Sequence, residues 1–168
     1  MAKSNRKKYA IVAVVAIVAV LAGIYFFVIN PIFVMKPFIP KAALGEDIIA
    51  DNVNWLVNEL GAYKLHANPL TGETPQMEIL ITDTGEKFTS TTIGNMPSTN
   101  MGIPVEGPTP DIRIKVGKAN FAELYNSADL LAKAIAMQKE GKVQIELLKG
   151  MDVLAAKGYQ AIYSQLNG

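Results

Sequence analysis

Apolar side chains divide the sequence into one uninterrupted apolar stretch and a longer region where apolar and polar residues alternate. Residues 10–29 form the stretch: twenty consecutive residues without a charge, mostly Ala, Val, Ile and Phe. At 1.5 Å rise per residue, about twenty residues span the roughly 30 Å hydrocarbon layer of a bilayer. Only a helix satisfies its own backbone hydrogen bonds within that layer. We therefore predict a transmembrane helix over residues 9–30.

Charges beside this stretch predict its orientation. Residues 1–8 hold four basic side chains, whereas only Lys36 and Lys41 follow the stretch closely. Because basic flanks stay in the cytoplasm, residues 1–8 are predicted to form a cytoplasmic tail, with the remaining chain outside the cytoplasm at a plasma membrane. A cleaved signal peptide is the alternative. Its apolar region runs only about 7–15 residues and ends in small residues, so the longer stretch here favours an uncleaved anchor.

After the anchor, residues 31–42 contain Pro31, Pro37 and Pro40 and are predicted to form an extended, semi-stiff spacer. Residues 43–168 are predicted to form one domain. The first helix is expected over residues 42–60, where apolar residues recur at three- and four-residue spacings.

The rest of this domain mixes both periodicities. Alternation and β-branched residues predict strands over residues 62–67, 77–82, 88–93, 111–116 and 142–148. Helices are predicted over residues 120–125, over 127–139 with Ser127 as N-cap, and over 151–166. Residues 95–110, rich in Pro and Gly, are expected to form an irregular loop. This mixture predicts an α+β fold, with helices packed on an antiparallel sheet.

Charge and composition narrow the function. Half of the residues are hydrophobic, and four of the sixteen basic residues precede the anchor. Residues 31–168 therefore keep twelve basic against fifteen acidic residues, a balance of about −3. No basic patch favours nucleic acid. The chain has no cysteine, which excludes disulfides and thiolate metal sites.

Reactive groups are scarce. His66 is the single histidine, and a catalytic base needs oriented partners, so we interpret it as structural or exposed. Asp83 and Glu86 bracket a predicted hairpin turn, where Asp favours local hydrogen bonds. Neither a phosphate-binding loop nor a nucleophile elbow is present. We expect no catalysis, no cofactor and no metal.

Apolar helix faces remain open to two interpretations. The last helix, and Met96, Met101 and Met151, could belong to an ordinary core, which is the default for an amphipathic helix. They could equally line a cavity, because methionine suits adaptable apolar binding surfaces. Periodicity alone does not distinguish the two.

Short motifs in the C-terminal part follow a recognisable order. They are D-I-R-I at residues 111–114, N-F-A-E-L at 120–124, E-G-K-V-Q-I at 140–145 and K-G-M at 149–151. In this order they resemble the sterol carrier protein type-two family, over about residues 43–168 and most strongly over 110–155. The chain differs from the family pattern in lacking an aromatic residue before Gly141.

The resemblance implies a sheet of about five strands covered by helices, with an apolar tunnel that accepts sterols, fatty acyl chains or other lipids. The implied tunnel walls are Phe88, Ile112, Ile114, Phe121, Leu124, Leu131, Ile135, Ile145 and Leu147. The implied lid is Met151, Leu154, Ile162 and Leu166.

Two function classes follow. The first is a membrane-tethered domain that holds or transfers an apolar lipid, such as a sterol, a fatty acyl chain or an isoprenoid, with the bilayer and the lipid as partners. The second is a non-catalytic structural or assembly subunit of a cell-envelope complex, with the same fold used for protein contacts. A continuous apolar void favours the first class, and a filled core favours the second.

Overall fold

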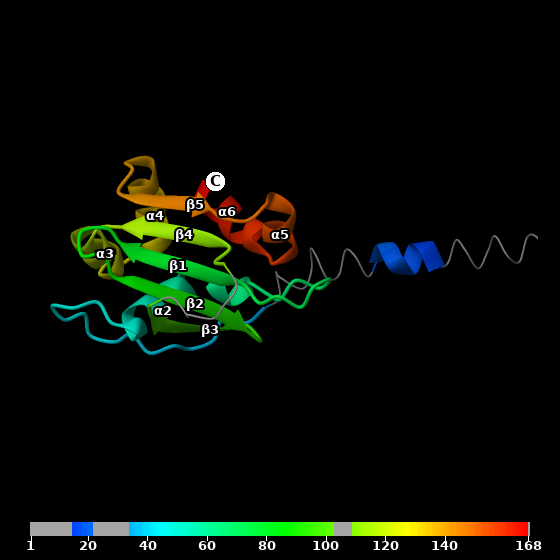
Figure 1. Ribbon diagram of the computed structural model, residues 1–168, viewed down its shortest axis with the longest axis horizontal. Helices are drawn as coiled ribbons and strands as arrows, with labels where there is room; N and C mark the ends of the chain where they lie inside the picture. Colours follow the sequence, from blue (N-terminus) through cyan, green and yellow to red (C-terminus); the bar gives the residue numbers. More distant parts are fainter. Residues whose placement is uncertain (1–14, 22–33, 103–108, 168) are drawn as a thin grey trace, which may run out of the picture. The chain divides into compact units, whose positions relative to one another are not determined.

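The computed structural model describes residues 15–21, 34–102 and 109–167 (Figure 1). The chain divides into two compact units, Met1–Val34 and Met35–Gly168. Residues 15–21 of the first unit are helical. Among the described residues, no helix is both long enough and apolar enough to cross a bilayer. Most of the predicted transmembrane helix, residues 9–30, lies outside the described residues.

The second unit is built on one five-stranded sheet. The strands are β1 Gln76–Ile81, β2 Lys87–Ile93, β3 Met96–Met101, β4 Ile112–Val116 and β5 Val143–Leu147. Their order across the sheet is β3-β2-β1-β4-β5. The β1–β4 pair is parallel and the other three pairs are antiparallel. The predicted α+β fold with a mainly antiparallel sheet of about five strands is confirmed.

Helices supply the second layer. They are α2 Ala50–Glu59, the 3-10 helix η3 Ala62–Lys64, α3 Lys118–Tyr125, α4 Leu130–Lys139, α5 Met151–Ala156 and α6 Tyr159–Asn167. In Figure 1, α2, α4 and α6 lie behind the strands.

Strand register sorts the side chains onto two faces. Met77, Ile112 and Leu147 lie side by side across three strands, and so do Ile79, Ile114 and Ile145. The next residue of each strand points to the opposite face, because strand side chains alternate. That face carries the ion pairs of Arg113 with Glu78 and of Lys115 with Glu146. The apolar alternation of the sequence thus identifies the face that the helices cover.

The first helix of the domain is shorter than predicted. We expected residues 42–60, whereas α2 begins at Ala50. The backbone N–H of Ile49 donates to Asn52 Oδ1 at 3.1 Å, which closes the first turn of the helix. Residues 42–49 instead run without helical structure. The predicted helix started too early because apolar residues before Ala50 have the same three- and four-residue spacing as those within α2.

Residues 35–49 form a strap along the domain. Pro37 O accepts a 3.1 Å hydrogen bond from Asn58, and Lys36 pairs with Glu59. Farther along, Ala42 O accepts a 2.6 Å bond from the Tyr125 hydroxyl. Residues 35–42 of the predicted spacer therefore contain no helix or strand and are held by the domain at several points.

Two regions near the sheet differ from expectation. Residues 62–67, predicted as a strand, contain η3, which follows the left-handed Gly61 (φ +104°). Residues 96–101, predicted as loop, form the edge strand β3, paired with β2 along its whole length. Pro97 and the polar side chains around it disfavour a strand prediction, yet proline is tolerated at a sheet edge.

Helix ends in the C-terminal half also differ. Asp129, and not Ser127, caps α4, because its carboxylate accepts the backbone N–H of Ala132 at 3.0 Å. The predicted single helix over residues 151–166 is two helices, α5 and α6. The break falls at Gly158, whose φ of +86° is left-handed. The apolar period continues through this break, so spacing alone did not locate it.

Candidate ligand-binding cavity

An apolar cavity of about 350 Å³ lies between the helix-covered face of the sheet and the helices. Its sheet side is formed by Met77 of β1, Ile112 and Ile114 of β4, and Ile145 and Leu147 of β5. These residues sit on three adjacent strands in register. Alternating apolar residues in β1, β4 and β5 therefore produce one continuous apolar floor.

Helical residues complete the lining. Val57 and Leu60 come from the apolar stripe of α2 and its C-terminal end, and Leu154 and Ile162 come from α5 and α6. The left-handed Gly158 turns the chain between α5 and α6, so both short helices contribute to the cavity. A straight helix would present one face only.

Exposed residues border the cavity on one side. Leu147, Met151 and Tyr163 line it and are also exposed to solvent. Asp152 and Gln160 are exposed polar lining residues. An apolar chain can therefore lie inside while a polar group stays near water, the arrangement common in lipid and small-molecule sites.

A smaller cavity, about 50 Å³, continues toward the other end of the sheet. Its lining includes Phe121 and Leu124 of α3, Ala134 and Gln138 of α4, and Val143 of β5. Four residues line both cavities: Val57, Leu60, Ile114 and Ile145. These side chains form the boundary between the two spaces.

A buried polar cluster adjoins the larger cavity through Tyr159, which lines it. The buried Asp111 carboxylate accepts hydrogen bonds from Lys157 Nζ at 2.7 Å, the Tyr159 hydroxyl at 3.0 Å and the Gln76 backbone N–H at 2.8 Å. Lys157 Nζ also donates to Thr74 O at 3.2 Å. Burial, and then the negative charge of Asp111, raise the pKa of Tyr159 well above 10. The cluster ties the α5–α6 junction to the start of β1 and β4.

Seven residues implied by the family resemblance line the larger cavity. They are Ile112, Ile114, Ile145, Leu147, Met151, Leu154 and Ile162. Phe121 and Leu124 line the smaller cavity. Their part in binding a ligand stays a prediction.

Four other implied residues lie elsewhere. Phe88 is fully buried in the core, and Leu131 is exposed on α4. Ile135, on the same helix, is half-buried and lines neither cavity. Leu166 falls in α6, and its side chain lies outside the described residues. The family resemblance placed Leu131 and Ile135 in the tunnel wall, but α4 turns Ala134 and Met137 into the core instead.

Sequence reasoning missed several lining residues. Met77 was recognised only as an alternating strand residue, and Val57 and Leu60 only as part of an amphipathic stripe. Tyr159 and Tyr163 also line the larger cavity. Each of these residues falls on a helix or strand face that the sequence predicts to be apolar. Which of those faces pack against each other depends on the tertiary structure.

The candidate catalytic residues have local partners. His66 Nδ1 lies 3.1 Å from Ala67 O, next to it in the chain. The Asp83 carboxylate accepts the backbone N–H of Lys118 at the start of α3, with its two oxygens at 2.8 and 3.0 Å. Glu86 accepts from Thr84 within the same turn. In the part of the chain that the structure describes, no group of three His, Asp or Glu side chains could hold a metal ion.

Comparisons with known proteins give distant likenesses. No family model matches the chain, and no curated protein matches it. Among solved structures, the chain is similar to the ubiquinone synthesis protein UbiJ-SCP2, with a TM-score of 0.36 and 6% identity over 55% of this chain and 70% of that one. It is also similar to palmitated SCP2L2 from Aedes aegypti, with a TM-score of 0.36 and 18% identity over 67% of this chain and 91% of that one.

A third likeness is to the inverting sec-alkylsulfatase Pisa1 from Pseudomonas sp., with a TM-score of 0.38 and 15% identity. It covers 67% of this chain but only 16% of the sulfatase. TM-scores and identities this low do not assign the chain to a family, so its function has to be argued from the cavity itself.

Proposed function

We propose that the chain is a membrane-tethered, non-catalytic protein that holds or transfers an apolar lipid in the cavity between the sheet and α2, α5 and α6. The ligand class is a sterol, a fatty acyl chain or an isoprenoid. The tether is the apolar stretch of residues 10–29, with the domain outside the cytoplasm at a plasma membrane.

One observation carries this proposal: an apolar cavity of about 350 Å³ that is bordered by exposed apolar and polar side chains. Its volume lies near the lower end of the roughly 300–1,000 Å³ of small-molecule sites. A domain that used this fold only for protein contacts would be expected to fill its core, because interiors are close-packed. The void supports a ligand-holding role over a purely structural one.

Binding at such a site is an equilibrium, and no bond needs to be made or broken. Each Å² of apolar surface removed from water contributes about 25 cal/mol. The hydroxyl of Tyr159 is already engaged by Asp111, so the other side-chain polar groups at the cavity border are those of Asp152, Gln160 and Tyr163. A tether keeps the domain near the bilayer and raises its effective concentration there.

Native mass spectrometry with lipid extraction tests the proposal. The protein should begin at Met35, because this keeps the contacts of Lys36 and Pro37 with α2 within the compact unit Met35–Gly168. We expect a co-purifying apolar lipid on the unmodified unit. Ala155→Trp, which places an indole on a cavity-lining position of α5, should displace it.

The matched control is Ala136→Trp, an exposed position on α4 that lines neither cavity. It should retain the lipid. Clean lipid-free masses for all three proteins, together with no binding of fluorescent fatty acids, would contradict the proposal and favour the structural subunit.

A further inference from the structure

We propose that one end of the domain docks on the lipid bilayer and presents the cavity to it. This end, here called the apolar end, carries six exposed apolar side chains: Met35, Leu70, Ile93, Met96, Leu147 and Met151. The inference rests on the tether proposed above and adds the surface that contacts the membrane.

Strand register places two of the contributing segments, the β2–β3 turn and the end of β5, at the same end of the sheet. β1 begins beside the end of β2, because Gln76 pairs with Thr91. β4 begins beside the end of β5, because Ile112 pairs with Leu147. Since β1 and β4 are parallel, all four strand ends meet at the same end of the sheet. Figure 1 shows β2 and β5 pointing toward the side where β1 and β4 begin.

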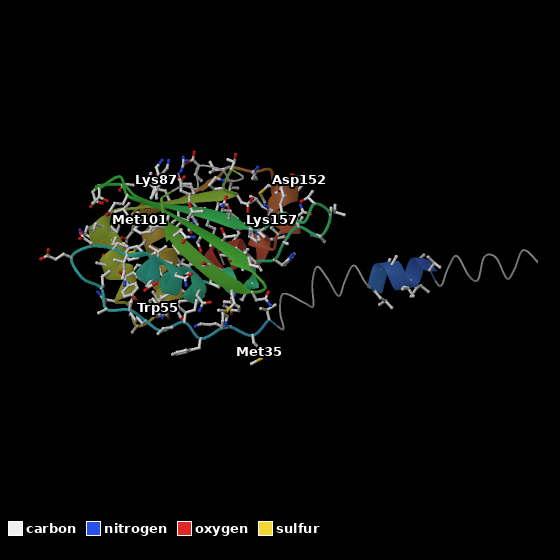
Figure 2. All side chains as sticks on the ribbon, turned by 60° about the horizontal axis from the view of Figure 1, so that its bottom comes forward. Met35, Trp55, Lys87, Met101, Asp152 and Lys157 are labelled. Atoms are coloured by element: carbon white, nitrogen blue, oxygen red, sulfur yellow. The ribbon has the colours of Figure 1, made fainter. Side chains whose placement is uncertain are left out.

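The loop before β1 and the start of the strap reach the same end. Pro75 O accepts the backbone N–H of Thr92, which joins the loop holding Leu70 to the end of β2. Thr92 Oγ1 donates to Ala62 O just after α2, and the C-terminal residue of α2, Glu59, pairs with Lys36. Met35 therefore lies at this end. In Figure 2, Met35, Asp152 and Lys157 lie toward one end of the domain, and Lys87 and Met101 toward the other.

The six residues are 44 to 90% exposed. They come from five separate segments: the strap, the loop before β1, the β2–β3 turn, the end of β5 and the start of α5. Concentrated exposed apolar residues mark an interaction surface, whereas scattered ones need no explanation. Leu147 and Met151 also border the larger cavity, so the surface and the cavity are continuous.

The short connection to the predicted transmembrane helix indicates that the apolar end contacts the bilayer. Only residues 31–34 separate the predicted transmembrane helix from Met35. Four residues span at most about 14 Å even when fully extended. The strap is then fixed to α2 from Lys36 and Pro37 onward. A bilayer crossed by residues 9–30 is thus the apolar phase that Met35 and its neighbours can reach.

Charges at this end nearly balance. Among the described residues near it, Lys36 pairs with Glu59, and Lys157 pairs with Glu73 and Asp111. One further residue of each sign, Lys149 and Asp152, flanks Met151 in the sequence. Attraction to anionic headgroups therefore contributes little, and insertion of apolar side chains supplies the binding. Docking should therefore occur on neutral phosphatidylcholine. It should change little between low and high salt, because salt screens attraction between charges and this attraction contributes little here.

Spin labelling of the full chain tests the inference, because the chain has no cysteine and one introduced cysteine is unique. Leu70→Cys and Met96→Cys place a nitroxide on the apolar end. Met101→Cys is the matched control, since Met96 and Met101 occupy opposite ends of β3 and are 51 and 61% exposed. Each labelled chain is reconstituted in phosphatidylcholine nanodiscs, and power saturation measures access to oxygen and to a water-soluble nickel chelate.

We expect the labels at positions 70 and 96 to favour oxygen several-fold over the nickel chelate, relative to the label at 101. Equal access at all three positions in chains that elute with the discs would overturn docking and leave the tether standing. Chains that do not elute with the discs would overturn both. Dipolar broadening at position 96 that disappears on dilution with unlabelled chain would show a second copy on this surface and would also overturn docking. None of these readings depends on lipid in the cavity, which mass spectrometry tests separately.

Discussion

Lys157 supplies the positive charge of the buried polar cluster beside the larger cavity. It is buried, and its ammonium group pairs with the equally buried Asp111 and donates to Thr74 O. Removing one partner of a buried ion pair leaves the other charge without compensation and costs about 3–5 kcal/mol. We expect Lys157→Met to lower the free energy of unfolding by about that amount, measured by urea denaturation of the compact unit.

Lys142→Met is the matched control for this substitution. Lys142 pairs with Glu140 at 2.7 Å, but both side chains are largely exposed, so the unfolding midpoint should hardly move. A cycle with Asp111→Asn should show strong coupling to Lys157→Met. Additive effects of the two substitutions would be inconsistent with a direct pair.

Tyr159 is expected to make the stability of the domain fall at alkaline pH. Burial and the Asp111 carboxylate raise the pKa of Tyr159 well above 10 in the fold, whereas an unfolded tyrosine ionises near pH 10. Above about pH 10, the unfolded chain loses this proton and the folded chain keeps it. The stabilisation is therefore complete below that pH and declines above it, by at most about 1.4 kcal/mol per pH unit.

Tyr159→Phe removes the titrating group. The stability advantage of the unmodified protein over this variant should shrink as the pH rises through the region above about 10. Urea unfolding at a series of alkaline pH values measures the difference. Parallel stability curves for the two proteins would show that Tyr159 ionises alike in both states.

At the scale of elements, the break between α5 and α6 shapes the cavity lining. Gly158 has φ +86°, and a Cβ there would lie 3.2 Å from Lys64 O and 3.3 Å from the His66 ring. Left-handed backbone costs a residue with a Cβ about 1–2 kcal/mol, and the contacts add to it. We expect Gly158→Ala to lower the free energy of unfolding by more than this amount and to weaken lipid retention, measured by denaturation and native mass spectrometry.

Gly72→Ala separates the cost of left-handed backbone from the cost of the close contacts. Gly72 has φ +74°, but a Cβ there would meet nothing within 4 Å. It should show the backbone cost alone and retain its lipid. A loss at Gly72 as large as that at Gly158 would mean that packing around η3 contributes nothing.

Elements with strong periodicity could be predicted from sequence, and elements fixed by single contacts could not. Strands β1, β2, β4 and β5 alternate clearly, so their positions were predicted within a residue or two. The start of α2 depends on Asn52 and the start of α4 on Asp129. β3 was missed because its pairing with β2, and not its own composition, makes it a strand.

At the scale of the whole molecule, the sequence alone predicted the faces of the cavity but not its extent. Alternation placed Ile112 and Ile114 on one face of their strand. The structure sets Ile145 beside Ile114 and brings α2, α5 and α6 over all three. Whether facing surfaces fill the space between them depends on side-chain volumes and on the helix break at Gly158. Periodicity carries neither quantity, which is why core and cavity remained open alternatives.

Two cavities whose linings share Val57, Leu60, Ile114 and Ile145 predict a limit on ligand length. A chain that fills the larger space meets these four side chains before it reaches the smaller one. Each buried methylene contributes about 0.8 kcal/mol, so affinity should rise with chain length and then level off. We expect Ile145→Ala to open the boundary and to move this plateau to longer chains, measured with a series of fatty alcohols on the compact unit.

Ile162→Ala is the matched control, because Ile162 lines the larger cavity but not the smaller one. Both truncations remove the same atoms and should destabilise the fold by up to about 2–5 kcal/mol, the range for buried isoleucine, with less where the side chain is only half-buried. Widening the larger cavity at Ile162 leaves its far boundary in place, so the plateau should stay at a similar chain length. If both variants shift the plateau alike, volume alone sets the length preference and the two cavities do not act in series. If only Ile145→Ala shifts it, the lipid extends from the apolar end along β4 and β5 toward α3.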